Sequence, residues 1–244
     1  MKIDIWSDIM CPFCYIGKRK LESALQKFEH NAEVDIIWHS FQLDPAIQYQ
    51  PGKDLYTYLA ERKGQTREWS VMVHNQMTEN AKRDGLTYNF DKAIIANSFD
   101  AHRLIQLAKT HGLGDAAEEK LFKAYFTDGK NVSDHNTLMQ IGMEIGLRAV
   151  EIGEMLNSND FADEVHADIM MAERLGIHGV PFFLLDEQLG ISGAQPVEVF
   201  TDGLQQAWAI HEKAKQTEIN NNTGAVCTPD GVCLPAGMET IKNN

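Results

Sequence analysis

Cys11 and Cys14 form a Cys-Pro-Phe-Cys motif close to the N-terminus. Such a pair suits a redox dithiol, half of a zinc site, or two buried structural thiols. Buried structural thiols are disfavoured because the pair lies between a strand-like and a helix-like segment, not on an apolar stripe. Zinc would need two further ligands, which only the C-terminal cysteines or a histidine could supply. A redox dithiol is favoured because the motif follows a strand in a β–α–β pattern.

The position of the motif at a helix start explains this chemistry. Unpaired N–H groups and the positive end of the helix dipole stabilise an anion there, so the pKa of a thiol falls. We expect Cys11, the more N-terminal residue, to be exposed and to act as the nucleophile. Cys14 lies one turn along, faces inward, and is placed to resolve a mixed disulfide.

Hydrophobic spacing predicts the elements that position this motif. Residues 2–6 and 34–43 read as strands and residues 14–30 as an amphipathic helix, so a parallel β–α–β unit is expected. Residues 180–185 and 190–193 read as an antiparallel hairpin, followed by a helix over 196–215. Between these parts the pattern is helical, with pieces expected over 54–63, 66–84, 91–111, 114–127, 133–145, 150–157 and 160–175.

These elements predict an α/β fold with a large all-helical insertion and a C-terminal tail. We expect residues 1–53 and 178–215 to form one α/β domain, with residues 54–177 as the insertion. Residues 216–244 are polar, lack periodicity and are expected to be a flexible tail.

Pro181 stands at the start of the third expected strand and has two readings. It is either an ordinary strand-start proline or a cis-proline beside the dithiol. In the second reading the Val180 backbone pairs with an extended substrate segment, as in strand addition.

The motifs together resemble the DsbA family of the thioredoxin superfamily. The segments IDIWSDIMCPFCYIGKRKLE and NSFDAHRLIQLAK resemble its FrnE-like branch, which is related to 2-hydroxychromene-2-carboxylate isomerases and kappa-class glutathione transferases. The resemblance covers residues 1 to about 215 and implies a thioredoxin-like fold. It implies Cys11 as nucleophile, Cys14 as resolving thiol and Pro181 as cis-proline, with Pro12, Phe13 and Val180 contacting substrate.

The resemblance also suggests that Asn97, His102 and Arg103 line a cleft over the dithiol; the alternative is a capping or salt-bridging role in mid-helix. Two departures from the family pattern bear on function. Pro12-Phe13 replaces the Pro-His of strongly oxidising DsbA proteins, so a strongly oxidising potential is not expected. The isomerase branch has a serine where this chain has Cys11, so retention of both cysteines favours thiol–disulfide chemistry.

Cys227 and Cys233 form a second pair, around a Thr-Pro-Asp-Gly turn in the tail. They read as a structural staple, as a redox relay to the Cys11–Cys14 pair, as a zinc clip, or as residues without a role. Some FrnE-like proteins resemble this chain in carrying an extra C-terminal pair, which favours the relay.

Composition limits the partners. The 244 residues carry 22 basic and 35 acidic side chains and a net charge of −13, which argues against nucleic acid and against a polybasic membrane anchor. Most of this charge lies in residues 54–177 and is expected to cover solvated helix faces. No apolar run is long enough to span a membrane, and no basic-then-apolar leader is visible, so a cytoplasmic location is expected.

The sequence therefore predicts a protein thiol–disulfide oxidoreductase that acts on protein or small thiol and disulfide substrates. No metal or organic cofactor is expected; the redox-active disulfide does the chemistry, with glutathione as a candidate co-substrate. The first alternative is a glutathione-dependent isomerase or transferase of the 2-hydroxychromene-2-carboxylate isomerase type. The second is a non-catalytic peptide-binding module.

Overall fold

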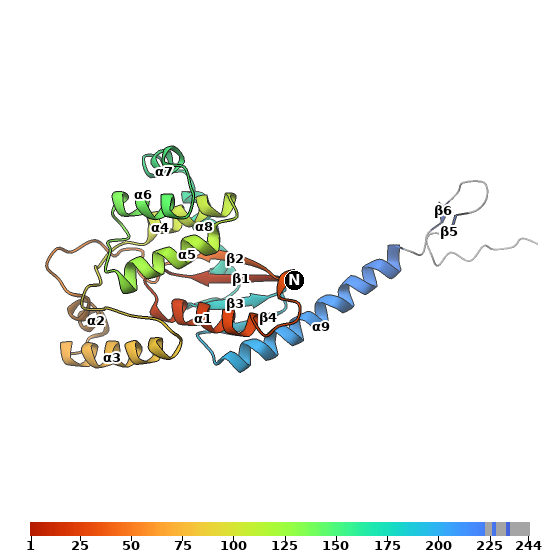
Figure 1. Cartoon of the computed structure of the whole chain (residues 1–244), viewed down its shortest axis with the longest axis horizontal. Coiled ribbons are helices and arrows are strands. Elements are labelled where there is room, and N and C mark those ends of the chain that lie inside the picture. Colours follow the sequence, from red (N-terminus) through yellow and green to blue (C-terminus); the bar gives the residue numbers. More distant parts are fainter. Residues whose placement is uncertain (223–225, 228–232, 235–244) are drawn as a thin grey trace, which may run out of the picture.

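The computed structural model describes residues 1–222, 226–227 and 233–234. Its centre is a four-stranded sheet in the order β2-β1-β3-β4 (Figure 1). The strands are β1 (Lys2–Ser7), β2 (Asp35–Ser40), β3 (Phe182–Leu185) and β4 (Leu189–Ser192). β1 and β2 are parallel, whereas β3 is antiparallel to both β1 and β4. The parallel pair and the hairpin expected from the sequence are confirmed.

Helices cover both faces of the sheet. Helix α1 (Pro12–Leu25) and helix α9 (Val197–Asn222) contact each other, and α9 also contacts β3 and β4. Helix α5 (Gly114–Phe122) contacts β2 on this same face, where its Asp115 accepts from Trp38 of β2 and from Lys18 of α1, both at 3.1 Å. On the opposite face, α8 (Ala162–Arg174) contacts β2, and its Asp168 contacts His39. The mixed α/β class and the large helical content predicted from the sequence are confirmed.

The helical segment divides into two groups. Helices α2 (Leu55–Lys63) and α3 (Arg67–Arg83) contact each other and lie beyond the carboxyl end of β1 (Figure 1). The other group contains α4 (Phe99–Thr110), α5, α6 (His135–Glu144), α7 (Ala149–Leu156) and α8. A π-helical turn, Lys123–Thr127, continues α5.

The helix expected over 91–111 is shorter than predicted, because α4 begins only at Phe99. The Asn97 side chain accepts from the Phe99 N–H at 2.8 Å and donates to the Pro45 and Ile47 carbonyls at 3.1 and 3.0 Å. An asparagine that bonds to nearby backbone groups competes with helical hydrogen bonds and sets a boundary.

The face between β2 and α8 holds a buried charge network. The His39 ring lies between the Asp168 and Asp4 carboxylates, with Nδ1 and Nε2 at 2.6 and 2.7 Å from them, and it stacks on Trp6. Asp168 also accepts from the Ser40 N–H at 2.8 Å and from Gln106 at 2.6 Å. Each side chain of this network contacts a side chain or backbone group of another element, so the network joins α8 and α4 to the sheet.

Glu118 of α5 is 1% exposed, and its Oε2 has no hydrogen-bond partner among the described residues. Burial, with Asp115 nearby, raises the pKa of Glu118 well above its usual value. A raised carboxyl pKa destabilises the fold increasingly as the pH rises above about 4.3, the unfolded value. We therefore predict that Glu118→Gln increases the free energy of unfolding by roughly 1–3 kcal/mol at pH 8, and by much less at pH 4.

Glu119 is the matched control for this prediction. Hydrogen bonds from Arg19 and Tyr15 outweigh burial and lower the pKa of Glu119. Glu119→Gln should therefore destabilise the protein near neutral pH. Urea unfolding of both variants at pH 4 and pH 8 measures the change in unfolding free energy that each substitution causes. A change of the same sign in both variants at pH 8 would contradict the prediction.

Candidate active site

The dithiol lies where β1 passes into α1. The Cys11 N–H donates to the Asp8 carbonyl at 2.9 Å, which closes a tight turn after the strand. Cys11 is then the N-cap residue of α1, in extended conformation, and Pro12 occupies the first helical position. Proline is tolerated there because that N–H has no partner in a helix. The Cys11 side chain thus stands at the positive end of the α1 dipole.

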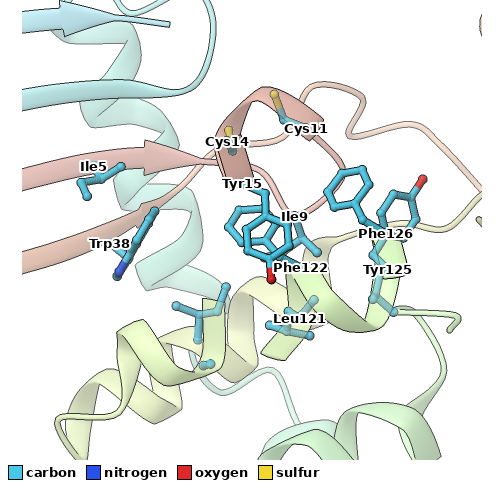
Figure 2. Close-up of a cluster of buried hydrophobic side chains, with 14 of the residues drawn as sticks. Ile5, Ile9, Cys11, Cys14, Tyr15, Trp38, Leu121, Phe122, Tyr125 and Phe126 are labelled. Carbon is cyan, nitrogen blue, oxygen red and sulfur yellow. The ribbon is translucent and has the colours of Figure 1, made fainter. Parts of the chain in front are cut away.

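Both cysteines are free thiols, and both are buried, with 3% of Cys11 and 1% of Cys14 exposed. The expectation that Cys11 is exposed is wrong, whereas Cys14 faces inward as expected. The reason is tertiary: the Cys11 Sγ lies 3.5 Å from the Val180 carbonyl oxygen, so the segment before β3 covers it. In Figure 2 the two sulfurs lie on the same side of the first turn of α1.

The surroundings of Cys14 favour the protonated thiol. Burial raises the pKa of Cys14 well above its ordinary value, and the neighbouring Cys11 raises it further. The neighbouring Asp8 backbone and Ser7 side chain act in the opposite direction. The two thiols of the motif therefore occupy different environments, one at the helix start and one in the core.

The Val180–Pro181 peptide bond is cis, and it places Pro181 against α1. Gly17 permits this approach, because a Cβ built there would lie 3.0 Å from the Phe183 ring and 3.1 Å from the Pro181 Cγ. We predict that Gly17→Ala costs roughly 1–3 kcal/mol of unfolding free energy and slows disulfide exchange, because Pro181 must move. A Cβ at Gly153 of α7 meets only one side-chain atom, at 3.6 Å.

Gly153→Ala is therefore the control, and it should be neutral or stabilise the protein by up to about 1 kcal/mol. Thermal unfolding of the two variants, with the exchange rate of each, measures the difference. Equal stability of the two variants would contradict the close packing of α1 on Pro181.

A cavity of about 500 Å³ opens beside the dithiol. Cys11, Pro12, Phe13 and Val180 form its wall on the dithiol side. Its other walls come from α2, from α3, and from the π-helical turn after α5, whose Tyr125 and Phe126 are labelled near Cys11 in Figure 2. Side chains from at least five separate segments thus meet next to one thiol.

Sequence reasoning missed two residues that hold the motif. The Asp8 carboxylate, 1% exposed, accepts from the Met10 N–H at 3.1 Å and the Leu43 N–H at 2.7 Å, so it shapes the turn before Cys11. The Tyr88 hydroxyl donates to the Pro12 carbonyl at 2.7 Å. Asp8 could have been suspected because it is adjacent to the motif, but nothing in the local pattern around Tyr88 points to this contact.

The three polar residues suggested by the family resemblance do not line this cavity. Asn97 precedes α4 and does not lie in mid-helix; its amide joins that boundary to the loop after β2, as described above. His102 is fully buried, with its Nε2 3.6 Å from Asp8, so it lies behind the cavity wall. Arg103 pairs with Asp100 and donates to the Ser158 carbonyl at 2.7 Å. The capping and salt-bridging alternative describes Asn97 and Arg103.

The second cysteine pair lies in a short antiparallel ladder, β5 (Val226–Cys227) and β6 (Cys233–Leu234). Cys227 and Cys233 are directly opposite each other in its register. Their side chains, and the turn between them, lie outside what the structure describes.

Two kinds of feature are absent from the part of the chain that the structure describes. No group of three or more His, Cys, Asp or Glu side chains there is arranged to hold a metal ion. Nor is any described helix long and apolar enough to cross a membrane.

The DSBA-like thioredoxin domain family matches residues 2–205. The chain belongs to this family. A probable DsbA oxidoreductase from Streptomyces coelicolor is 36% identical, with a TM-score of 0.81 over 97% of this chain and 100% of that chain. The thioredoxin-like fold and the DsbA resemblance predicted from the sequence are confirmed.

Two further solved structures share the fold of this DsbA-like chain. The cytosolic disulfide reductase DsbM from Pseudomonas aeruginosa is 17% identical, with a TM-score of 0.59 over 89% of this chain and 100% of that chain. A 2-hydroxychromene-2-carboxylate isomerase is 13% identical, with a TM-score of 0.59 over 90% of this chain and 98% of that chain. At these identities the likeness is one of fold alone.

Proposed function

We propose that the protein is a protein thiol–disulfide oxidoreductase that acts through Cys11 and Cys14. One observation carries this proposal: a free Cys11 thiol stands at the N-cap of α1, beside an apolar cavity, with the Cys14 thiol one turn behind it. Membership of the DsbA-like family supports the same chemistry.

The reaction balances as a two-electron exchange. The Cys11 thiolate attacks one sulfur of a substrate disulfide, forms a mixed disulfide, and releases the other substrate sulfur as a thiolate. Cys14 then attacks the Cys11 Sγ, which releases the second substrate sulfur and leaves a Cys11–Cys14 disulfide. The substrate gains two electrons and the protein loses two; the reverse sequence oxidises a substrate dithiol.

The environment of Cys14 orders these steps. While Cys11 is free, it contributes to the raised pKa of Cys14 and keeps that residue a thiol. Once Cys11 is in a mixed disulfide, its thiol no longer contributes to that rise, whereas the opposing effects of Asp8 and Ser7 remain. The pKa of Cys14 therefore falls when its thiolate is required for resolution.

The proposal includes the setting of the reaction. The chemistry needs no metal or organic cofactor, and a thiol such as glutathione is the expected co-substrate for recycling. We place the protein in the cytoplasm, which agrees with the description of the related DsbM as cytosolic.

Equilibration in glutathione redox buffers tests the proposal. The fraction of protein with a Cys11–Cys14 disulfide, quantified by mass spectrometry after alkylation, should follow a two-electron curve. Failure to form that disulfide at any buffer composition would refute the proposed function.

Glutathione-dependent isomerisation is the second candidate, because an isomerase shares the fold. It requires glutathione binding and isomerase turnover that survive Cys14→Ser. A third outcome, binding of unfolded protein that Cys11→Ala leaves unchanged without any exchange activity, would indicate a peptide-binding module.

We further propose that Cys227 and Cys233 exchange disulfides with the Cys11–Cys14 pair. Their opposed backbone positions support a pair that can close a disulfide. Replacing both with serine should slow re-oxidation of Cys11–Cys14, timed after a pulse of reductant. An unchanged rate would reject the redox relay. The remaining alternatives would be a structural disulfide, a zinc clip, or a pair of cysteines without a role.

A further inference from the structure

The cavity beside Cys11 is the feature of this site whose occupant remains to be assigned. At about 500 Å³ it lies within the range of roughly 300–1,000 Å³ found for sites that enclose small ligands. Cys11 opens onto it, so whatever fills it lies next to the reacting sulfur. Phe13 and Leu43, which are 44% and 43% exposed, extend its apolar surface outward.

Most of the wall opposite the dithiol is apolar or aromatic. Helix α2 contributes Leu55 and Leu59, and α3 contributes Trp69, Val73 and Met77. Apart from Trp69, these side chains form no strong hydrogen bonds to a polar ligand. An apolar ring that moves from water into the cavity is stabilised by the hydrophobic effect. The wall therefore favours a ring-sized apolar group.

Two cationic side chains line the cavity; Lys63, at the end of α2, is exposed, whereas Arg62 is already paired. The Arg62 guanidinium forms an ion pair with Asp44 and donates to the Tyr58 hydroxyl and the Leu43 carbonyl, both at 2.8 Å. A ligand carboxylate would have to displace these partners. At Arg62 a ligand carboxylate therefore competes with groups that are already bound, whereas an uncharged ring does not.

His74 and Tyr125 add polar groups to the lining. Nδ1 of His74 donates to the Ser70 carbonyl at 2.7 Å, which leaves Nε2 as a hydrogen-bond acceptor; burial lowers the pKa of His74, so the ring stays neutral. Tyr125 also lines the cavity, and burial together with the nearby Asp8 raises the pKa of its hydroxyl, which keeps its proton to donate. One polar atom on an otherwise apolar ring matches these groups, as in tyrosine or tryptophan.

We propose that this cavity selects polypeptide disulfides in which an aromatic side chain lies next to the reacting cysteine. The proposal rests on the proposed function and names its substrate class. Cys11 exchanges with the substrate sulfur at one end of the cavity while the neighbouring ring enters between α2, α3 and the π-helical turn. The electron balance is that of the exchange described above.

The test uses the pre-reduced full-length protein and two model peptides with one intramolecular disulfide each. The peptides differ only at the residue beside one cysteine, which is Tyr in one and Ser in the other. The second-order rate constant for peptide reduction should be at least about tenfold larger for the Tyr peptide, because burying a ring is worth more than the 1.4 kcal/mol that corresponds to tenfold.

Val73→Trp fills the cavity and should bring the Tyr/Ser ratio of rate constants toward one. Met72→Trp is the matched control, because Met72 directly precedes Val73 in α3, is 52% exposed and does not line the cavity; it should leave the ratio unchanged. If Val73→Trp unfolds, Met77→Trp fills the same space from the next turn.

A ratio near one in the unmodified protein, or a ratio that survives cavity filling in a folded variant, would overturn the proposal. Both results leave the proposed function intact as long as the peptides are reduced. Failure of the reduced protein to reduce either peptide, together with failure of the oxidised protein to oxidise their dithiol forms, would instead reject the proposed function.

Discussion

Replacing Cys11 with serine is expected to lower the rate of disulfide exchange by about 10³-fold or more, because the attacking sulfur is lost. A serine hydroxyl at the N-cap still lies at the positive end of the helix dipole, but it is far less nucleophilic than a thiolate and cannot form a disulfide. The fold should be retained, since serine is a favoured N-cap residue. Reduction of a model peptide disulfide, monitored by chromatography, measures the loss.

Cys14→Ser is the diagnostic partner of this variant. Without the resolving thiol, the mixed disulfide between Cys11 and substrate should accumulate and persist. A covalent adduct of one substrate per protein, sensitive to reductant, should appear by mass spectrometry in Cys14→Ser and be absent in Cys11→Ser. An adduct on Cys14 in the Cys11→Ser protein would reverse the assignment of nucleophile and resolving residue.

Asp168→Asn is expected to reduce the free energy of unfolding by about 3–5 kcal/mol, the cost of breaking a buried ion pair by removing one charge. The Asp168 carboxylate accepts from His39, the Ser40 N–H and Gln106, and the amide cannot accept all three. Asp163→Asn is the control, because Asp163 lies on the same helix and is exposed; it should cost no more than about 0.5 kcal/mol.

The loss in Asp168→Asn should depend on pH with a defined sign. Burial disfavours the charge on His39, but the Asp168 and Asp4 carboxylates outweigh burial and raise its pKa. The stabilisation by charged His39 is therefore complete below about pH 6.5, its unfolded value, and is lost as the pH rises through the raised folded value. Asp168 and Asp4 have lowered pKa values, so their share is lost only in acid.

The difference in unfolding free energy between the unmodified protein and Asp168→Asn should thus be largest near pH 5–6 and smaller at pH 9. Urea unfolding across this range measures it. A difference that grows with pH would mean that His39 is neutral in the folded protein.

Much of the fold was predictable because it depends on local patterns. Alternating apolar residues specify β1, and the helical spacing after Cys14 specifies α1, so the β–α–β order follows from short windows of sequence. The boundary before α4 was not predictable from periodicity, because it depends on hydrogen bonds between Asn97 and a loop some 50 residues earlier in the chain.

The candidate site divides in the same way. The motif and the place of Pro181 in the chain order are visible in the sequence, as is the start of a helix at Cys11. The polar residues of α4 were expected in the cleft because their helix carries a family-like motif, yet His102 packs inside the core. When a helix is buried on several sides, its hydrophobic periodicity does not show which of its faces contacts which neighbouring element.

By itself, the sequence determined the Cys-Pro-Phe-Cys motif, its place at a helix N-terminus and the thioredoxin-like order of elements, because each depends on residues close together in the chain. Only the tertiary structure decided that Cys11 is covered by Val180, that α2, α3 and the π-helical turn enclose an apolar cavity beside it, and that His39 lies between two carboxylates. The burial of these side chains and their electrostatic environment depend on contacts between segments that are distant in the chain. The spacing of residues within one segment does not determine those contacts.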